Sequence, residues 1–495
     1  MSESGFDIED IDELHADLPS VTGIGARAMR NGALILAARL VSRLIALVSV
    51  VVMGNALGAA GYGQYQNAVT YGAIIGVVMD LGLTTLYVRE GARAPAKAGQ
   101  FLSALASGKI ILVVAVIPVL WLALWSASIA SLFWTSLALV IVTSYANILR
   151  NTFYATQQLT YEAALIIPEA VLLLLLVLLG AYEHFGPAYY LGAYGAVGLA
   201  VCGYVLIVLH RKKIARLHWS LDIPLLRSWL RAGLPLAMVY IITNVYFKMD
   251  VPILQHFRTY REVGWYSLAY KPFESLLFIP MTLRAVLFPV VSVYAKSDIH
   301  RARIAAEKFF RSLVLAGLPC TIGIALLAPQ LTSLLHLYPQ SVPALGILAL
   351  AIVFMFADNT FVATFTAVDQ QRTFAWIAAT GMLVNLVLDL VLIPLFGYLG
   401  ASWAVVITEA FLMVLGWSIL ARTFHRLPVF RLSWKLLLAG SIMGIVVWVL
   451  RPPVGAVMPL LGVIVLAGVM YTALLLLFRV FDDDDLHLMK TLVRR

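Results

Sequence analysis

Fourteen apolar segments follow one another along this 495-residue chain. A helix needs roughly 20 residues to cross a hydrocarbon layer about 30 Å thick. Only 12% of the residues are charged, whereas soluble domains carry about 25%. We therefore predict an all-α polytopic membrane protein with 14 transmembrane helices, at 31–54, 67–88, 100–124, 131–149, 162–182, 187–209, 232–254, 265–292, 311–332, 343–367, 374–395, 398–420, 433–450 and 456–478.

Lys and Arg are distributed unequally between alternate loops. If the N-terminus is cytoplasmic, the cytoplasmic segments hold 26 of the 35 Lys and Arg residues, and the outer loops hold three. Cytoplasmic loops of membrane proteins carry such an excess, so we predict that both termini are cytoplasmic. The basic residues are spread over short loops without interleaved aromatic residues, which argues against a nucleic-acid partner.

The chain begins with an acidic segment. Its first 20 residues hold seven acids and no Lys or Arg, the reverse of a signal peptide, whose first region is basic. We expect a solvated tail there. The two cysteines, Cys202 and Cys320, lie in apolar segments without metal-ligand spacing, so we expect them to act as small hydrophobic residues. We expect no metal and no other cofactor.

A short motif recurs halfway along the chain. Three positions match at a constant offset of 201 residues, Gly63 with Gly264, Tyr65 with Tyr266 and Ala68 with Ala269. Six apolar segments separate the copies, so both halves enter the membrane in the same direction. Parallel repeats of this kind let two bundles rock around a central site. Because glycine permits unusual backbone angles, we expect the chain to reverse direction at both motifs.

The repeat divides the chain into predicted domains. We expect two parallel six-helix repeats around a central cavity. The last two helices fall outside the repeat and should be peripheral. The predicted parts are a cytoplasmic acidic tail (1–25), an N-terminal six-helix bundle (26–210), a cytoplasmic basic linker (211–231), a C-terminal six-helix bundle (232–421), helices 13 and 14 (422–480) and a cytoplasmic tail (481–495).

Two arginines lie deep inside the first apolar segment. Arg39 and Arg43 are four residues apart and share one helix face, roughly 12 and 18 Å from residue 31. A charge near the midplane costs about 2.5–3.5 kcal/mol, and two guanidinium groups about 6 Å apart repel by roughly 3 kcal/mol at an effective dielectric of about 20. A bound anion would remove this repulsion, and a diphosphate suits the bidentate fork of arginine. No Lys or Arg lies 201 residues after either arginine, so the first half alone carries this pair of charges.

The alternative is a structural ion pair between each arginine and a buried acid. Candidate partners are Glu169, Asp250, Glu274, Asp358, Asp389 and Glu409. Arg284 has no helical neighbour of opposite charge, and it joins Lys248 as a further candidate for binding an anionic head group. Lys271 and Glu274 are three residues apart, and we expect them to pair with each other.

No phosphate-binding loop of the G-x-x-x-x-G-K-[ST] type occurs, so ATP-driven pumping by this chain is not expected. A secondary transporter would instead need buried carboxylates that exchange a proton or an ion. The candidates for that coupling are Asp250, Asp358, Asp389 and Glu409.

Several motifs resemble one family in their order and spacing. They are Leu57-Gly58-Ala59-Ala60-Gly61-Tyr62-Gly63-Gln64-Tyr65, Asp80-Leu81-Gly82-Leu83, Val88-Arg89-Glu90, Asp250 before Val263-Gly264-Trp265-Tyr266, Asn385 to Asp389 leading into Ile393-Pro394-Leu395-Phe396-Gly397, and Gly400-Ala401 before Glu409. This pattern resembles the oligosaccharide-lipid flippases of the multidrug/oligosaccharidyl-lipid/polysaccharide exporter superfamily. The resemblance implies twelve helices around an alternating cavity and a polyprenyl-diphosphate-linked glycan as substrate. That family often has Asn where this chain has Asp389.

We therefore expect a flippase, not an enzyme, in the bacterial plasma (inner) membrane. It would move the glycan to the outer face for surface polysaccharide synthesis, in contact with membrane lipid and with a polymerase and other assembly proteins. The alternatives are a peptidoglycan-precursor flippase or a small-molecule antiporter of the same superfamily. A polytopic glycosyltransferase or polymerase is disfavoured, because the outer loops are short and 55–66 and 125–130 carry no charge.

Overall fold

The computed structural model describes residues 21–215 and 217–480, which form helices and turns without any strand. The main helices are α2 (Val21–Gly76), α3 (Leu83–Arg93), α4 (Ala98–Ser126), α5 (Phe133–Ala155), α6 (Leu159–Tyr182), α7 (Pro187–Arg211), α8 (Ile223–Tyr246), α9 (Asp250–Phe257), α10 (Tyr260–Leu276), α11 (Phe278–Ser297), α12 (Ile299–Leu326), α13 (Ala328–Leu334), α14 (Ser341–Ala367), α15 (Gln371–Phe396), α16 (Tyr398–Thr423), α17 (Val429–Leu450) and α18 (Val457–Leu477). Most of the predicted acidic tail and the predicted C-terminal tail lie outside the described residues.

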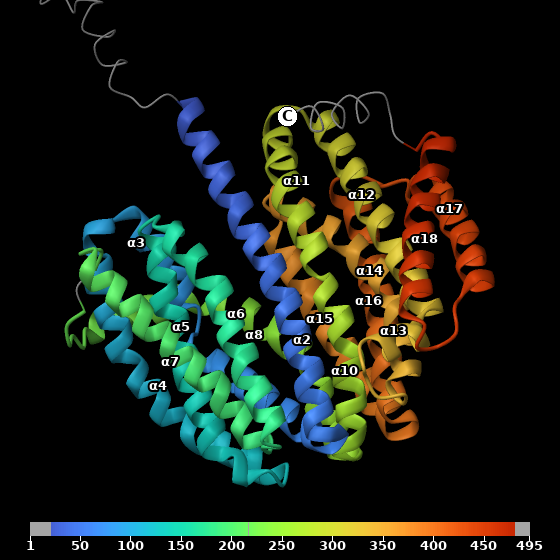
Figure 1. The fold of residues 1–495 in the computed structure, drawn as a ribbon. Coiled ribbons are helices and arrows are strands. Elements are labelled where there is room, and N and C mark those ends of the chain that lie inside the picture. The colour runs from blue at the N-terminus through green and yellow to red at the C-terminus, as the bar shows by residue number, and fades with distance from the viewer. Residues whose placement is uncertain (1–20, 216, 481–495) are drawn as a thin grey trace, which may run out of the picture.

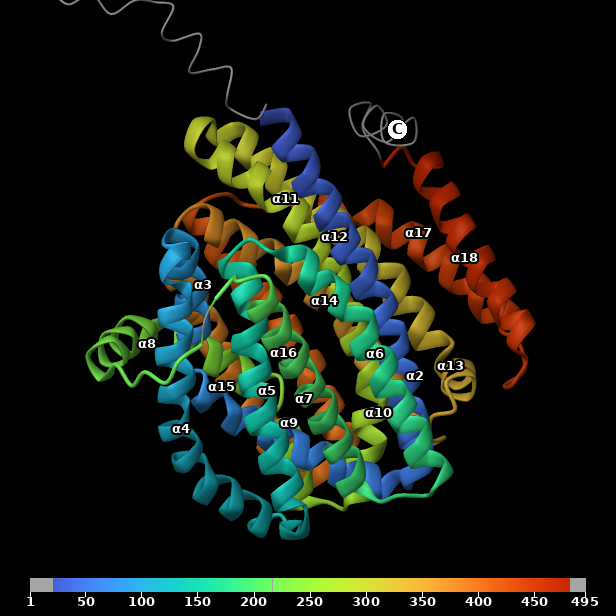
Figure 2. The same cartoon turned by 60° about the vertical axis from the view of Figure 1, so that its left-hand side comes forward.

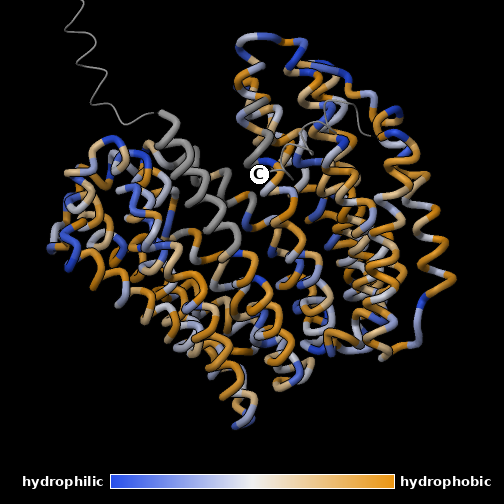
Figure 3. The backbone as a smooth tube through the Cα atoms, turned by 45° about the horizontal axis from the view of Figure 1, so that its top comes forward, coloured by the Kyte–Doolittle hydropathy of each residue, from blue (hydrophilic) through white to orange (hydrophobic). Residues whose placement is uncertain are grey.

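The predicted all-helical membrane fold is confirmed. Among the described residues, 11 helices are long and apolar enough to cross a membrane. The other three predicted crossings correspond to the second part of α2, to α8 with α9, and to α10 with α11, each of which is merged with or broken from a neighbouring helix. Large apolar side chains such as Trp134 and Trp376, 75% and 76% exposed, suit contact with lipid. Figure 3 shows apolar residues along the helices and hydrophilic residues gathered near their ends.

The helices form two bundles that meet along α2 and α10 (Figure 1). In the first half α2 packs against α6, and α5 packs against α4 and α7. In the second half α14 packs against α10, α12 and α16. The two halves lie together where α10 begins and spread apart toward the end where α2 begins (Figure 1).

Three helices lie at the edges of these bundles. Helix α17 packs on α12, and α18 packs on α17, so the last two helices are peripheral. Helix α8 contacts α15 of the second half and also α3 and α4 of the first half, as Figure 2 shows. The first helix of the second repeat therefore bridges the two halves.

The chain reverses direction a few residues before each repeated motif. Helix α2 breaks at Gly58, whose φ of 66° is a conformation that favours glycine. In the second half α9 ends in extended backbone at Arg258, and α10 starts after the extended Thr259. The offset of 201 carries Gly58 onto Thr259. Our expectation of a turn within 61–68 and 262–269 was wrong, because both segments lie inside helices.

The repeated glycines instead bring the two halves into backbone contact. A Cβ atom added to Gly63 would overlap the carbonyl oxygen of Tyr260, and one added to Gly264 would overlap the carbonyl oxygen of Ala59. The offset of 201 carries Ala59 onto Tyr260 and Gly63 onto Gly264, so the two contacts are related by the repeat. We call this pair of contacts the glycine crossing. Small residues of this kind allow helix backbones to approach closely in membranes.

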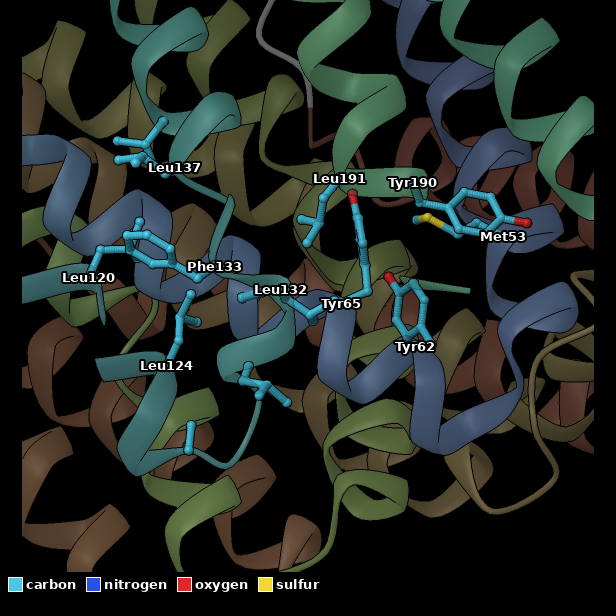
Figure 4. Packing of buried hydrophobic residues seen from close by; sticks show 14 of the residues in the cluster. Met53, Tyr62, Tyr65, Leu120, Leu124, Leu132, Phe133, Leu137, Tyr190 and Leu191 are labelled. Atoms are coloured by element: carbon cyan, nitrogen blue, oxygen red, sulfur yellow. The ribbon is translucent and has the colours of Figure 1, made fainter. Parts of the chain in front are cut away.

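A cluster of aromatic and aliphatic residues fills the first half beside the glycine crossing (Figure 4). Tyr62 and Tyr65 of α2 lie in it, with ring centres 5.9 Å apart. Leu124 of α4, Phe133 of α5 and Tyr190 of α7 complete the packing. All five side chains are buried. This packed end of the first half borders the cavity described next.

Candidate functional site

A cavity of about 720 Å³ lies within the first half, between α2, α5, α6 and α7. Tyr194 of α7 lines it and packs on Tyr65, with ring centres 6.1 Å apart, so the aromatic cluster closes one end of the cavity. The other polar lining residues are Arg39, Ser42 and Arg43 of α2, Thr143, Asn147, Arg150, Asn151 and Tyr154 of α5, and Glu162 and Glu169 of α6.

Arg39 and Arg43 both line this cavity, and both are exposed. The Nη2 atom of Arg39 donates a hydrogen bond to the Tyr154 hydroxyl at 3.0 Å. Arg43 makes no hydrogen bond or ion pair within the described part of the chain. Neither arginine forms a salt bridge among these residues, and Arg43 lies within electrostatic range of Glu274, one of the candidate partners.

Helix α2 starts earlier than we expected. Helix α2 begins at Val21, ten residues before the predicted start, because its polar first turns do not register as an apolar segment. Counted back from Gly58, Arg43 lies about 22 Å along the helix and Arg39 about 28 Å. Both arginines therefore lie within the long first part of α2, between its start at Val21 and the break at Gly58.

Arg150 is a cavity residue that our sequence reasoning missed. We placed it in a loop, because the predicted apolar segment ends at 149, but α5 continues to Ala155. Its Nη2 and Nε atoms donate to the two oxygens of Glu162, at 2.7 and 3.2 Å, and its Nη1 atom donates to Glu169 at 2.8 Å. We call these three residues the Arg150 triad. The available signal was a polar stripe on α5 at helical spacing, at Thr143, Asn147, Arg150, Asn151 and Tyr154.

The Lys271–Glu274 pair is confirmed, with Nζ and Oε2 2.9 Å apart. Arg43 of α2 and Lys248, between α8 and α9, lie within electrostatic range of the same carboxylate. Glu274 is thus surrounded by cations from both halves. Arg284 of α11 is half-buried and does not line the cavity. The structure therefore brings Arg39 and Arg43 to one cavity, places Lys248 within electrostatic range of Glu274 and does not place Arg284 in the cavity lining.

Asp250 and Asp389 are both buried in the second half. Asp250 accepts hydrogen bonds from the Tyr266 hydroxyl and from the Val251 backbone N–H. Asp389 of α15 is 0% exposed, and neither of its oxygens has a hydrogen-bond partner among the described residues. The side-chain nitrogen of Asn385, one helical turn earlier, also has none. The two carboxyl groups lie within electrostatic range of each other.

The other two candidate acids are Asp358 of α14 and Glu409 of α16. Glu409 is 4% exposed and accepts a hydrogen bond from the Tyr246 hydroxyl at 2.7 Å. Asp358 lies within electrostatic range of Glu409. All four candidate coupling acids therefore lie in the second half, as two pairs. In the described part of the chain, no group of three or more His, Cys, Asp or Glu residues is arranged to hold a metal ion.

Two helical bundles in parallel, with a polar cavity beside their contact, define a multi-pass membrane transporter. A family model described as "Polysaccharide biosynthesis protein" matches residues 28–295, a little over half of the chain. The chain belongs to this family. A second model, "Lipid II flippase MurJ", matches residues 266–466. The resemblance drawn from the sequence motifs is confirmed at the level of the family.

Several solved structures share this fold. "Lipid II flippase MurJ, inward closed conformation" has a TM-score of 0.76 and 14% identity, over 90% of this chain and 99% of the other. An inward-facing multidrug resistance MATE family transporter has a TM-score of 0.62 and 15% identity, over 77% and 96% of the two chains. The MATE multidrug transporter DinF-BH has a TM-score of 0.58 and 18% identity, over 83% and 98%. No curated protein sequence matches.

Proposed function

We propose that this protein is a flippase for polyprenyl-diphosphate-linked oligosaccharide, which it moves from the cytoplasmic to the outer face of the plasma membrane. The observation that carries this proposal is the Arg39 and Arg43 pair, exposed to a cavity and in no salt bridge among the described residues. An anion with several oxygens would relieve their repulsion, and a diphosphate supplies it. Family membership supports a role in surface polysaccharide synthesis.

The size of the cavity fits a head group without its lipid tail. Pockets of about 300–1,000 Å³ hold drug-sized ligands, and this cavity is about 720 Å³. It would admit a diphosphate and the first sugars, while the apolar polyprenyl chain stays in the bilayer. Because basic residues gather at the end where α2 begins, we place that end in the cytoplasm and the glycine crossing toward the outer face.

Transport would proceed by alternating access. The halves meet at the glycine crossing, and the cavity would receive substrate from the cytoplasmic side. Rocking of one half against the other would separate Gly63 from Tyr260 and Gly264 from Ala59, opening the outer side. Arg284 would act outside the cavity. Lys248 would contact the head group only once the halves approach each other.

We further propose that the paired acids of the second half couple transport to a proton or a small cation. Asp250 lies within electrostatic range of Asp389, and Asp358 lies within electrostatic range of Glu409. Two neighbouring carboxylates repel when both are ionised, so a shared proton or cation stabilises the pair. Ionisable residues inside membrane proteins commonly serve such relays.

The peptidoglycan-precursor flippase remains a second candidate. It is supported by the match of residues 266–466 to the lipid II flippase model and by the structural similarity to such a flippase. Its substrate would present the same diphosphate to Arg39 and Arg43. The two functions differ in the glycan, so complementation distinguishes them. A small-molecule antiporter for cations is disfavoured by the two exposed arginines.

The experiment is complementation of a strain that lacks the gene. We expect the Arg39→Ala, Arg43→Ala double variant to lose surface polysaccharide at unchanged protein level, because Arg150, the other cation lining the cavity among the described residues, is already paired with Glu162 and Glu169. Arg372→Ala, which removes an exposed arginine at the start of α15, is the matched control and should make normal polymer. Normal polymer from the double variant would contradict the proposal. Cell lysis on depletion, without loss of surface polymer first, would favour the peptidoglycan precursor.

A further inference from the structure

We propose that the wall of the cavity formed by α5 and α6 is a glycan subsite for uncharged sugars, and that Glu169 makes it discriminate against acidic sugars. This inference rests on the proposed function and adds the class of sugar nearest to the diphosphate. The arginines of α2 would hold the phosphates, while the opposite wall would contact hydroxyl and amide groups. The subsite is built from the Arg150 triad and the amide side chains of α5.

The first argument is that one acid of the triad is not needed to connect α5 and α6, because a single arginine–carboxylate pair is enough to do so. Glu162 is 3% exposed and pairs with Arg150 through both of its oxygens. That bidentate pair already neutralises the guanidinium and joins the helices. Glu169 accepts one further hydrogen bond from Arg150 through Oε2, and its side chain is 32% exposed. Its Oε1 atom makes no hydrogen bond within the described residues and is free to accept one from a ligand.

The second argument is the distribution of charge across the cavity. The Arg150 triad holds one cation and two anions, a net charge of −1, whereas Arg39 and Arg43 contribute +2 on α2. The cavity therefore has a basic wall and an acidic wall. A phosphate favours the first. A sugar carboxylate placed against the second would meet a like charge in a partly desolvated site, which is an effective way to reject a ligand.

The third argument is that α5 supplies donors and acceptors in the mixture that sugar hydroxyls need. The Nδ2 atom of Asn151 donates to Asn147, to Oδ1 at 3.0 Å and to the backbone oxygen at 2.8 Å. This arrangement leaves the Asn147 amide nitrogen as a donor and the Asn151 amide oxygen as an acceptor toward the cavity. Thr143 lies one turn earlier on the same wall. Neutral hydroxyl and N-acetyl groups can satisfy all of these atoms.

The fourth argument is that the two walls join at one point. Arg39 donates to the Tyr154 hydroxyl at 3.0 Å, so the basic wall of α2 touches the polar stripe of α5 there. The tyrosine accepts this hydrogen bond and keeps its own proton to donate. A diphosphate on Arg39 would therefore lie beside the glycan wall. That is the geometry required by a substrate whose first sugar is bonded to the diphosphate.

The test compares three probes on purified full-length protein. They are undecaprenyl diphosphate, undecaprenyl diphosphate carrying N-acetylglucosamine, and undecaprenyl diphosphate carrying glucuronic acid. We expect wild-type protein to bind the N-acetylglucosamine probe at least tenfold more tightly than the glucuronic acid probe. Glu169→Gln should tighten binding of the glucuronic acid probe about tenfold and change the other two by less than about threefold, because it removes only the like charge.

The variants distinguish a glycan subsite from a purely structural role of Glu169, and they test the subsite separately from the proposed function. If Glu169→Gln weakened all three probes equally, or left the discrimination unchanged, the subsite would be refuted. Asn147→Asp adds a carboxylate to the same wall outside the triad, and should weaken the glucuronic acid probe selectively even if Glu169→Gln folds poorly. Failure of wild-type protein to bind any of the three lipids would instead refute the proposed function. Arg39→Ala with Arg43→Ala should weaken all three together.

Discussion

The two halves of this protein share a helical plan related by an offset of 201 residues but use charge in opposite ways. In the first half, Arg39 and Arg43 are exposed to a cavity of about 720 Å³. In the second half, Asp250, Asp389 and Glu409 are 5%, 0% and 4% exposed. Exposed cations can exchange a large ligand, whereas buried acids can exchange only a proton or a small ion. The comparison suggests that a duplicated scaffold divided binding and coupling between its copies.

The largest effect is expected at the glycine crossing, where both halves make the same contact. Gly63→Ala and Gly264→Ala each place a methyl group on a backbone carbonyl of the other half, so each should prevent closure of the glycine crossing and reduce transport at least tenfold. Because the contacts are related by the repeat, the two effects should be similar. Complementation measures transport, and accessibility of a nearby introduced cysteine measures opening. Gly462→Ala, where nothing lies within 4 Å of the added carbon, is the control. A defect in only one of the two variants would break the symmetry argument.

The second-largest effect tests whether the first half binds the substrate while the second half couples transport to a proton or a small ion. Asp389→Asn removes a buried carboxyl without a described partner, while Arg43→Ala removes a cavity cation. We expect Asp389→Asn to abolish stimulation of transport by a proton or sodium gradient and to leave the affinity for undecaprenyl diphosphate within about threefold. Arg43→Ala should show the reverse pattern. The measurements are flipping of a labelled lipid in proteoliposomes and equilibrium binding. Stimulation that persists in Asp389→Asn would remove this residue from coupling.

The smallest effect concerns stability within the Arg150 triad. Glu162→Gln breaks a buried charge-assisted pair and should lower the free energy of unfolding by about 1–3 kcal/mol. Glu169→Gln alters a partly exposed contact and should cost less than about 1 kcal/mol. Denaturation of the purified protein measures both changes. Equal losses would mean that Glu169 is as structural as Glu162, contrary to its assignment as a ligand-facing group.

The sequence predicted the helices well because a chain in lipid must satisfy its backbone polar groups internally, and helices do so. The predicted segment 398–420 and the helix α16 (Tyr398–Thr423) nearly coincide. The pairing of Lys271 with Glu274 was predictable for a similar local reason, since three residues separate them on one helix.

The site was predicted less completely, because hydropathy reports where apolar residues end and not where helices end. Arg150 fell just beyond a predicted segment, although α5 continues past it. The start of α2 was misjudged for the same reason, because its polar first turns precede the predicted segment. Whether Arg284 lines the cavity with Arg39 depends on how the two halves pack together, which no local pattern in the sequence contains.

The glycine crossing consists of main-chain atoms and two residues without side chains. At each contact the partner residue, Ala59 or Tyr260, contributes its backbone carbonyl oxygen. The lining of the cavity is a separate set of positions on α2, α5, α6 and α7. Substitutions in the cavity lining could therefore change which glycan is bound without altering the contact at which the two halves move. A related protein for a new glycan would need different lining residues but the same glycine crossing.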